Sequence, residues 1–460
     1  MTFSDYIDYL RGKRIGVIGF GVSNQPLVRV LLQNGCDVTV CDRRERAQLG
    51  AAGDEAAAQG AKFALGADYL EHLDFDVIFR TPGVLPIVPQ LRKAAQNGAI
   101  LTSEMEAFCN LCPCRILAIT GSDGKTTTST ITAELLRAQG YTVHLGGNIG
   151  TPLFDRIADI RPDDFAVLEL SSFQLHSMHC APDVAIITNI SPNHLDVHPD
   201  LEDYVSAKCS IYRGQRPDGV LVLNARDAHT PRFAAEAPGR VRYFSSIGPV
   251  ENGVYCSDGV IYRAHGGKAE KLIDVSDIRI PGAHNVENYM AAFAATDGLV
   301  GQAACVQVAR SFAGVPHRME RIRELNGITF INDSIASSPT RTIAGLHALP
   351  KPPVIILGGH DKHIPFDELG DEVCLHAKAV VVVGETAQRI AAAIRGSKFY
   401  DPGKLPLVEA QDFRAAVETA YRLAQPGDTV TLSPACSSFD FFKNFAERGD
   451  TFRAIVESLQ

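Results

Sequence analysis

The sequence predicts an α/β protein of three domains, each built on a mainly parallel sheet. The chain has 460 residues, which corresponds to about three domains of ordinary size. Short apolar, β-branched runs alternate with segments of helical spacing, as expected where helices connect parallel strands. This alternation starts afresh three times, at intervals that match the size of a domain.

The predicted strands fall into three groups. The first group has strands at 14–19, 37–41 and 76–79, with helical spacing at 25–33 and 44–59. The second has strands at 115–120, 165–170, 184–188 and 220–224, and the Gly-rich, polar stretch 250–271 predicts hairpins. The third has strands at 328–332, 353–357, 379–383 and 428–432. Seams near residues 103 and 314 give predicted domains at 1–103, 104–314 and 315–460.

Composition and charge exclude several classes of protein. Hydrophobic residues make up 45% of the chain and charged residues 21%, which is typical of a globular protein. The 44 basic and 53 acidic residues give a formal charge of −9, which argues against binding to nucleic acid. No apolar run is long enough to span a bilayer, and residues 1–14 lack the apolar core of an export signal. Eleven scattered cysteines indicate reduced thiols, so we expect a cytoplasmic protein outside the membrane.

The strongest functional motif is the segment 120–127, Thr-Gly-Ser-Asp-Gly-Lys-Thr-Thr. It follows a predicted strand and begins a helix that runs to about residue 139, the setting that a phosphate-binding loop requires. Lys125 would reach the outer phosphates of a nucleotide, and the Thr126 hydroxyl would ligate Mg²⁺. Ile119 stands at the first glycine position of the common motif. The sequence therefore predicts a central domain like those of phosphate-loop ATPases, between two Rossmann-like domains.

A second glycine loop, at 19–24, follows the first predicted strand, and Asp42 ends the next one. The spacing resembles the dinucleotide-binding pattern, although Asn24 replaces its third glycine. We expect this loop to bind a nucleotide. An NAD site and a plain tight turn are the alternatives.

Polar residues also follow later strands of the central domain. Glu169 ends a strand at the sheet edge that carries the phosphate loop, where a carboxylate is suited to holding Mg²⁺. The loop 189–196 carries His194 and Asp196, which we expect close to a metal ion. Lys208 lies in a predicted helix, and its spacing alone indicates a solvated side chain.

Three polar loops follow strands of the C-terminal domain, at 332–334, 358–362 and 433–440. Because the carboxyl ends of parallel strands share one edge of a sheet, these loops should cluster. Lys362 and the hydroxyls of Ser337 and Ser438 would suit a small anionic substrate. Ordinary polar turns are the alternative.

Together these motifs resemble the Mur ligase family, the ATP-dependent amino-acid-adding enzymes of peptidoglycan synthesis, over the whole chain. The phosphate loop matches the family's ATP loop, with Asp123 where asparagine is usual. Further matches are the segments 169–175, 193–196, 281–288, 316–320 and 332–334. The segments 358–362 and 433–440 are similar to those of the glutamate-adding members. The arginine-containing motif of the diaminopimelate- and lysine-adding members is not found in the sequence.

The resemblance implies an ATP site and two Mg²⁺ ions. The ATP-binding residues would be Gly121, Ser122, Asp123, Gly124, Lys125, Thr126, Thr127, Asn285, Asn288, Arg318 and Asp333. Thr126 and Glu169 would hold one Mg²⁺, and His194 with a carbamylated Lys208 would hold the other. The implied catalytic residues are Lys125, His194 and Lys208. Carbamylation would replace the ammonium of Lys208 with an anionic oxygen that suits Mg²⁺.

The resemblance also implies two substrate sites. The residues near the UDP part of UDP-N-acetylmuramoyl-L-alanine would be Phe20, Gly21, Val22, Ser23, Asp42 and Arg43, with Asn148 facing the muramoyl-alanine end. Glutamate would be bound by Ser337, Lys362, Ser438, Phe439 and Phe445. The familiar glutamate-adding pattern reads Asn-Asp-Ser-Lys-Ala-Thr, and here Ile335 replaces the lysine and Ser337 the threonine. Isoleucine cannot pair with a carboxylate, so the identity and stereochemistry of the amino acid depend on compensation elsewhere.

The resemblance implies a monomeric, ATP-dependent ligase that adds D-glutamate to UDP-N-acetylmuramoyl-L-alanine through an acyl phosphate, releasing ADP and phosphate. One alternative is a related ligase that uses L-glutamate or another acceptor, similar to an L-glutamate-adding Mur enzyme or to folylpolyglutamate synthase. An NAD-dependent oxidoreductase would use Gly19, Gly21 and Asp42 and would leave Lys125 unexplained. A nucleotide-binding protein without turnover is the last alternative.

Overall fold

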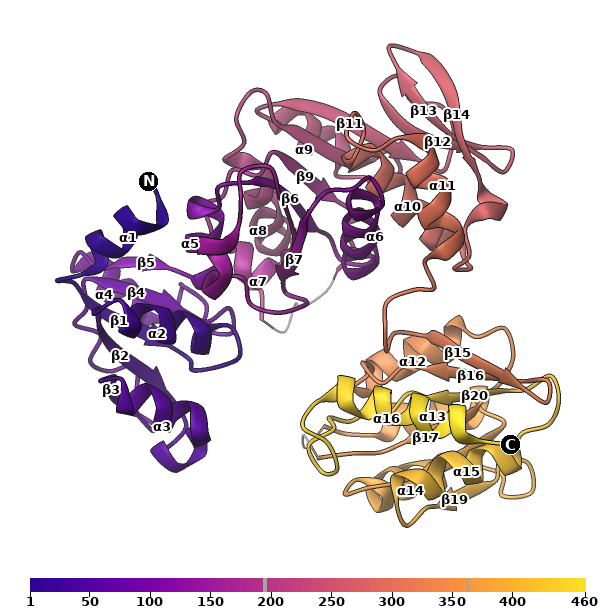
Figure 1. The fold of residues 1–460 in the computed structure, drawn as a ribbon. Coiled ribbons are helices and arrows are strands. Elements are labelled where there is room, and N and C mark those ends of the chain that lie inside the picture. The colour runs from indigo at the N-terminus through magenta and orange to yellow at the C-terminus, as the bar shows by residue number, and fades with distance from the viewer. Residues whose placement is uncertain (193–196, 362–363) are drawn as a thin grey trace. The chain divides into compact units, whose positions relative to one another are not determined.

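The computed structural model of the chain describes residues 1–192, 197–361 and 364–460. It divides into two compact units, Met1–Phe312 and Ala313–Gln460, and contains three sheets (Figure 1). The α/β class with three parallel-rich domains is therefore confirmed. The predicted domain bounds of 1–103, 104–314 and 315–460 stay predictions. Within the described residues, no helix is long and apolar enough to cross a bilayer.

The N-terminal sheet has five parallel strands in the order β3-β2-β1-β4-β5. The strands are β1 (Arg14–Ile18), β2 (Asp37–Asp42), β3 (Lys62–Leu65), β4 (Val77–Arg80) and β5 (Ile100–Thr102). The helices are α1 (Phe3–Leu10), α2 (Asn24–Gln33), the 3₁₀ turn η1 (Arg46–Leu49), α3 (Gly50–Ala58) and α4 (Pro89–Gln96). Strands β1 and β4 are buried on both faces, which explains their continuous apolar runs.

The central sheet has nine strands in the order β14-β13-β12-β11-β10-β9-β6-β8-β7. Its strands are β6 (Arg115–Thr120), β7 (Val143–Gly147), β8 (Phe165–Glu169), β9 (Val184–Ile187), β10 (Val220–Asn224), β11 (Arg240–Ser245), β12 (Gly253–Ser257), β13 (Val260–His265) and β14 (Lys268–Asp274). The first seven of these strands pair in parallel, and β12, β13 and β14 pair antiparallel. The hairpins predicted over 250–271 are thus confirmed.

The helices of this region connect the parallel strands or cover the sheet (Figure 1). They are α5 (Glu104–Leu111), α6 (Lys125–Ala138), α7 (Ser172–Leu175), α8 (Leu201–Arg213), α9 (Thr230–Glu236), α10 (Ala283–Ala295) and α11 (Gln302–Ser311), with 3₁₀ turns η2 (Phe154–Asp159) and η3 (Val275–Asp277). Helix α10 is buried without interruption from Asn288 to Ala295, and its small alanines let it pack closely against α6. This packing brings the start of α10 to the start of α6, where the phosphate loop lies.

The unit Ala313–Gln460 has one six-stranded sheet in the order β15-β16-β20-β17-β18-β19. The strands are β15 (Glu320–Leu325), β16 (Ile328–Asn332), β17 (Val354–Leu357), β18 (Ala379–Val382), β19 (Leu407–Glu409) and β20 (Thr429–Leu432). Among these described strands, β15 and β16 form the one antiparallel pair, and the other neighbouring strands pair in parallel. The helices are α12 (Pro339–Ala348), α13 (Asp367–His376), α14 (Ala387–Gly396), α15 (Phe413–Leu423) and α16 (Phe445–Ser458).

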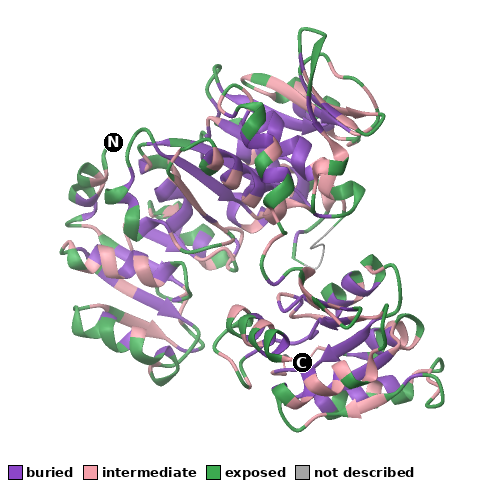
Figure 2. Ribbon diagram, turned by 45° about the vertical axis from the view of Figure 1, so that its right-hand side comes forward, coloured by how far each residue is buried: buried purple, intermediate pink, exposed green. Residues whose placement is uncertain are grey.

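Burial is concentrated in the strands and on the inner faces of the helices (Figure 2). Within Met1–Phe312, one apolar cluster includes residues of both the N-terminal and the central region, from Ile7 to Phe233. Arg80, at the end of β4, is 1% exposed and donates to Ser177 Oγ (2.6 Å) and the Phe173 carbonyl (3.2 Å). Burial lowers the pKa of Arg80 to about 10, so this link keeps its charge at neutral pH.

Candidate active site

The phosphate loop lies between β6 and α6, as the sequence predicts. Gly121 (φ 146°) and Gly124 (φ 77°) both adopt positive φ, which favours glycine. A Cβ on Gly124 would also lie 2.3 Å from Asn288 Oδ1, so a larger residue would displace the Asn288 side chain. The first N–H groups of a helix have no partner within that helix, which makes this end of α6 suited to phosphate oxygens.

The loop is held from a neighbouring strand as well. The backbone N–H of Ser122 donates to the Asn189 carbonyl (2.9 Å), and that of Asp123 donates to Asn189 Oδ1 (3.0 Å). Thr188 Oγ1 donates to the Asp123 carbonyl (2.6 Å). The residues that follow β9 therefore fix the shape of the loop before any ligand binds.

Lys125 folds back over the same loop. Its ammonium donates to the carbonyls of Gly121 (2.9 Å) and Ser122 (2.8 Å), in addition to other contacts. Thr128 Oγ1 donates to Asn288 Oδ1 (3.2 Å), and Asn288 Nδ2 donates to Asn285 Oδ1 (3.2 Å). The structure thus brings the two predicted asparagines of α10 to the phosphate loop.

Glu169 ends β8 beside this loop, because Ile119 of β6 is its register partner. Its side chain is buried, and Oε1 accepts a hydrogen bond from Asn148 Nδ2 (2.8 Å). Oε2 is also buried and has no hydrogen-bond partner among the described residues. A buried carboxylate oxygen left without a partner is costly unless a cation binds it. Together with the hydroxyl of Thr126, in the first turn of α6, this carboxylate gives the hard oxygen donors that Mg²⁺ prefers.

Lys208 is buried, so the solvated side chain indicated by spacing alone is wrong. Its residue is 1% exposed, and its Nζ donates to the Gly121 carbonyl (2.7 Å) and lies 4.6 Å from the centre of the Tyr204 ring. Burial, helped by the nearby charge of Lys125, lowers the pKa of Lys208 well below its usual range. Lys208 lies on the buried side of α8. The spacing of apolar residues in the sequence did not show which side of the helix this lysine occupies.

His194, which the resemblance implies would hold the second Mg²⁺ together with Lys208, lies outside the described residues. So does Lys362 of the C-terminal unit.

The N-terminal glycine loop is held by Asp42. Asp42 Oδ2 accepts the Phe20 N–H (2.7 Å) and an Arg44 N–H (2.8 Å). Burial alone would raise the pKa of Asp42, but these donors lower it to about 2. The Phe20 side chain lies in the core, whereas Gly21, Val22, Ser23 and Arg43 are exposed. Asp42 therefore positions the loop, and Phe20 can offer a ligand only its backbone.

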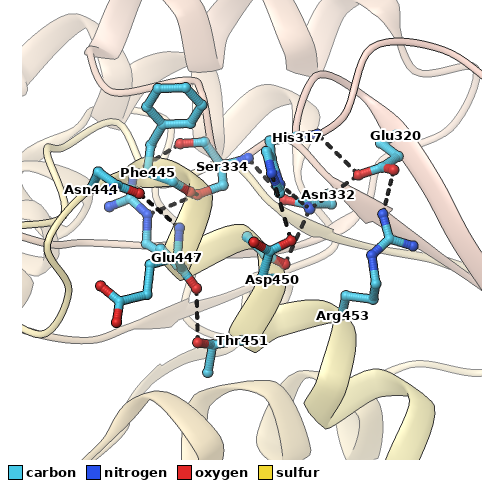
Figure 3. Close-up of polar contacts among 12 residues, drawn as sticks. His317, Glu320, Asn332, Ser334, Asn444, Phe445, Glu447, Asp450, Thr451 and Arg453 are labelled. Carbon is cyan, nitrogen blue, oxygen red and sulfur yellow. Dashed lines mark hydrogen bonds and ion pairs between the residues drawn. The ribbon is translucent and has the colours of Figure 1, made fainter. Parts of the chain in front are cut away.

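In the C-terminal unit, Asp333 follows β16 and is buried. Its Oδ2 accepts from Ser433 Oγ (2.8 Å) and its Oδ1 from the Met319 N–H (3.2 Å). Figure 3 shows that the residues before Arg318 and Asp333 are also linked, because Asn332 Nδ2 donates to His317 Nδ1 (3.0 Å). Asn332 Oδ1 accepts the Ser334 N–H (3.1 Å), which fixes this orientation of the amide. Arg318 and Asp333, the two residues predicted to contact the nucleotide here, therefore directly follow two residues that are hydrogen-bonded to each other.

Burial raises the pKa of Asp333 to about 6. Because an unfolded aspartate titrates near pH 4, the folded chain holds this proton more tightly, and stability from this group falls as pH rises from about 4 to 6. We expect Asp333→Asn to remove this pH dependence, which amounts to at most about 3 kcal/mol in the free energy of unfolding. Asparagine can still bond both neighbours, since the Ser433 hydroxyl can accept as well as donate.

The measurement is urea unfolding of wild type and Asp333→Asn at pH 4.5 and pH 7. The variant should gain stability relative to wild type at pH 7 and lose that advantage at pH 4.5. An equal difference at both pH values would contradict the account.

Of the predicted glutamate residues that the structure describes, Ser337, Ser438 and Phe439 lie in loops that follow β16 and β20, and Phe445 begins α16. Ser438 is buried, Ser337 is half-buried, and Phe439 (65%) and Phe445 (39%) are exposed. Arg448 was not predicted from the sequence. Its buried guanidinium donates to the carbonyls of Ser334 (2.9 Å) and Cys436 (3.1 Å), so it joins two of these loops. An arginine on an amphipathic helix is usually solvated, and no sequence pattern marked this one.

The sheets and the loop between β6 and α6 indicate an α/β protein whose loop geometry suits nucleotide phosphates. Two family models match the chain, the Mur ligase middle domain over residues 119–296 and the Mur ligase glutamate ligase domain over residues 317–436. The chain is 45% identical to the UDP-N-acetylmuramoylalanine–D-glutamate ligase of Acetivibrio thermocellus, over 99% of both chains. It is 43% identical to the enzyme of the same name from Clostridium kluyveri, over 100% of this chain and 99% of the relative.

Solved structures share the fold at lower identity. The UDP-N-acetylmuramate-alanine ligase of Thermotoga maritima has a TM-score of 0.54 at 18% identity, covering 97% of this chain and 99% of its own. A MurF structure from Acinetobacter baumannii has a TM-score of 0.56 at 19% identity, covering 96% and 90%. The chain belongs to the Mur ligase family, and it is an ATP-dependent ligase.

Proposed function

We propose that this chain adds D-glutamate to UDP-N-acetylmuramoyl-L-alanine in peptidoglycan precursor synthesis. The observation that carries the proposal is the phosphate loop with the buried carboxylate of Glu169 beside it, in a chain 45% identical over its length to a D-glutamate ligase. Carboxylates are poor acyl donors, and a nucleotide site next to a metal-binding carboxylate is suited to activating one by phosphorylation.

ATP binds with its phosphates on the segment 121–127. Lys125 exchanges its carbonyl contacts for phosphate oxygens, and the backbone N–H groups at the start of α6 surround them. Asn285 and Asn288 contact the nucleotide from the same unit. Arg318 and Asp333, in Ala313–Gln460, remain the other two predicted ATP-binding residues.

Two Mg²⁺ ions complete the site. Thr126 and Glu169 hold one, and the unpartnered Glu169 Oε2 supports this assignment. His194 and Lys208 hold the other, with Lys208 carbamylated on Nζ. Only a neutral amine attacks CO₂, and the low pKa of the buried Lys208 supplies that form: an N–C bond forms and one proton leaves. When bound, the ions neutralise the charge of the phosphoryl group during transfer.

The reaction has two steps. A carboxylate oxygen of UDP-N-acetylmuramoyl-L-alanine attacks the γ-phosphorus of ATP, and the bond to ADP breaks, with Lys125 stabilising the charge on the moving phosphoryl group. The unprotonated amine of glutamate then attacks the carbonyl carbon of the acyl phosphate. The C–O bond to phosphate breaks, the nitrogen loses a proton, and an amide and free phosphate result.

The N-terminal loop binds the UDP part of the substrate. The exposed residues Gly21, Val22, Ser23 and Arg43 offer the contacts, and the Phe20 N–H already donates to Asp42. Asp42 acts by holding the loop, since its carboxylate already accepts from Phe20 and Arg44. Asn148, already bonded to Glu169, faces the muramoyl-alanine end.

D-glutamate is bound by Ser337, Lys362, Ser438, Phe439 and Phe445. Ile335 leaves no cation at the position of the familiar lysine. Arg341 of α12 supplies one nearby, because its Nη1 donates to the Ile335 carbonyl (3.4 Å). Its guanidinium offers further N–H donors for a carboxylate.

The enzyme works as a monomer in the cytoplasm, without nucleic acid or membrane as partner. All eleven cysteines are free in the structure, which is consistent with a reducing compartment. The test of the proposed reaction is the mass of the product formed from UDP-N-acetylmuramoyl-L-alanine, ATP and D-glutamate. The expected product is heavier than the acceptor by one glutamate less one water, and ATP hydrolysis without any new amide would contradict the proposal.

A further inference from the structure

A further group of side chains that could ligate a metal ion joins α7 to α8. His176 caps the end of α7, His198 precedes α8, and Asp203 lies in the first turn of α8. One ligand atom from each residue lies within 4.8 Å of the others. The proposed function uses none of these three residues.

We propose that His176, His198 and Asp203 bind a first-row transition-metal cation of the Zn²⁺ kind, tying α7 to α8. Two imidazoles and one carboxylate form a ligand set that suits Zn²⁺, Co²⁺ or Ni²⁺, whereas Mg²⁺ prefers oxygen ligands alone. The site therefore selects a different cation from the oxygen donors Thr126 and Glu169.

The two printed contacts of Asp203 are close to the ligand spacing of a zinc site. Asp203 Oδ2 lies 2.6 Å from His198 Nδ1, and Oδ1 lies 3.1 Å from His176 Nε2. In a tetrahedral zinc site, ligand atoms about 2.05 Å from the metal are about 3.3 Å apart. If a cation replaced the protons in these two contacts, the distance between Asp203 Oδ2 and His198 Nδ1 would increase by less than about 1 Å.

The surroundings support ligation as well. His198 Nε2 lies 3.0 Å from Ser172 Oγ, and a hydroxyl can accept from Nε2–H once Nδ1 binds a metal. The His198 ring is fixed by stacking on Phe173, with centroids 5.4 Å apart. The side chain of His198 is fully buried, but that of Asp203 is 29% exposed, which leaves a side open to a water ligand. Asp203 precedes Lys208 by five residues, so a cation here would fix the start of the helix that carries Lys208.

The test is titration of the metal-free full-length protein with CoCl₂, in excess Mg²⁺ to occupy oxygen sites, followed by visible absorption. A surface group, His347, Glu372 and His376, also offers three ligands, so the background protein carries His347→Ala and His376→Ala. We expect one equivalent of Co²⁺ with the d–d band of a four- or five-coordinate ion, and loss of the band on adding Zn²⁺.

His176→Gln and Asp203→Asn should each lose that band while the far-ultraviolet circular dichroism is unchanged. His229→Gln removes a similar His–Asp contact elsewhere (3.2 Å to Asp227) and should keep it. The proposal is overturned if the background protein shows no band or if both site variants keep the band. It is also overturned if the only absorption is a thiolate charge-transfer band, which would come from Cys112 and Cys114, whose sulfur atoms lie 3.4 Å apart. Metal binding is read without ATP turnover, so this result is independent of the proposed ligase activity.

Discussion

Lys125→Ala is expected to lower kcat by about 100-fold or more, while the fold is unchanged. The Lys125 ammonium already lies over the loop, 2.9 Å from the Gly121 carbonyl and 2.8 Å from that of Ser122. Its charge is best placed to act on phosphate oxygens during transfer, when negative charge is spread over the moving phosphoryl group. The measurement is steady-state phosphate release with saturating ATP and acceptor.

Arg137→Ala is the matched control for this variant. It removes a positive charge from the other end of α6, where the exposed Arg137 pairs with Glu134 (2.7 Å). This control should keep near wild-type kcat, and both variants should give wild-type circular dichroism. Turnover close to wild type in Lys125→Ala would contradict the assignment of the ATP loop.

Lys208→Ala is expected to be almost inactive and to regain part of its activity when acetate or another short carboxylate is added. Lys208 is buried beside the Gly121 carbonyl, and its removal leaves a space inside the site. A small carboxylate can enter that space and supply the anionic oxygen that a carbamate would offer to Mg²⁺. The measurement is kcat as a function of carboxylate concentration.

Lys208→Met is the matched control. Methionine fills the space with an apolar side chain, so this variant should fold, lack activity and not respond to carboxylates. If Lys208→Ala were active without added carboxylate, or if Lys208→Met recovered equally, Lys208 would not carry the metal-binding group.

The fold could be predicted from the sequence because local pattern and topology agree. The apolar runs at 115–120, 165–170 and 184–188 contain three strands of the central sheet that pair in parallel. The glycines at 121 and 124 also predicted their loop correctly, since both have positive φ angles and a Cβ would meet Thr188 at Gly121 and Asn288 at Gly124. The predicted residue roles themselves stay proposals.

Burial of single polar residues was harder to predict. The spacing of Lys208 indicated a solvated lysine because helical periodicity gives a face but not what covers it. Arg448 and Arg80 are buried only because carbonyls from distant segments surround their guanidinium groups. Such contacts join residues that are far apart in the chain, so they depend on tertiary packing that no local pattern contains.

The central claim is that this chain couples ATP cleavage to D-glutamate addition. The most direct test is phosphate release from the purified protein with Mg²⁺, ATP and UDP-N-acetylmuramoyl-L-alanine, comparing D-glutamate, L-glutamate and no amino acid. We predict release that depends on D-glutamate, which would make Ile335 a tolerated difference. Release that depends on L-glutamate alone, or no release with either isomer, would contradict the claim.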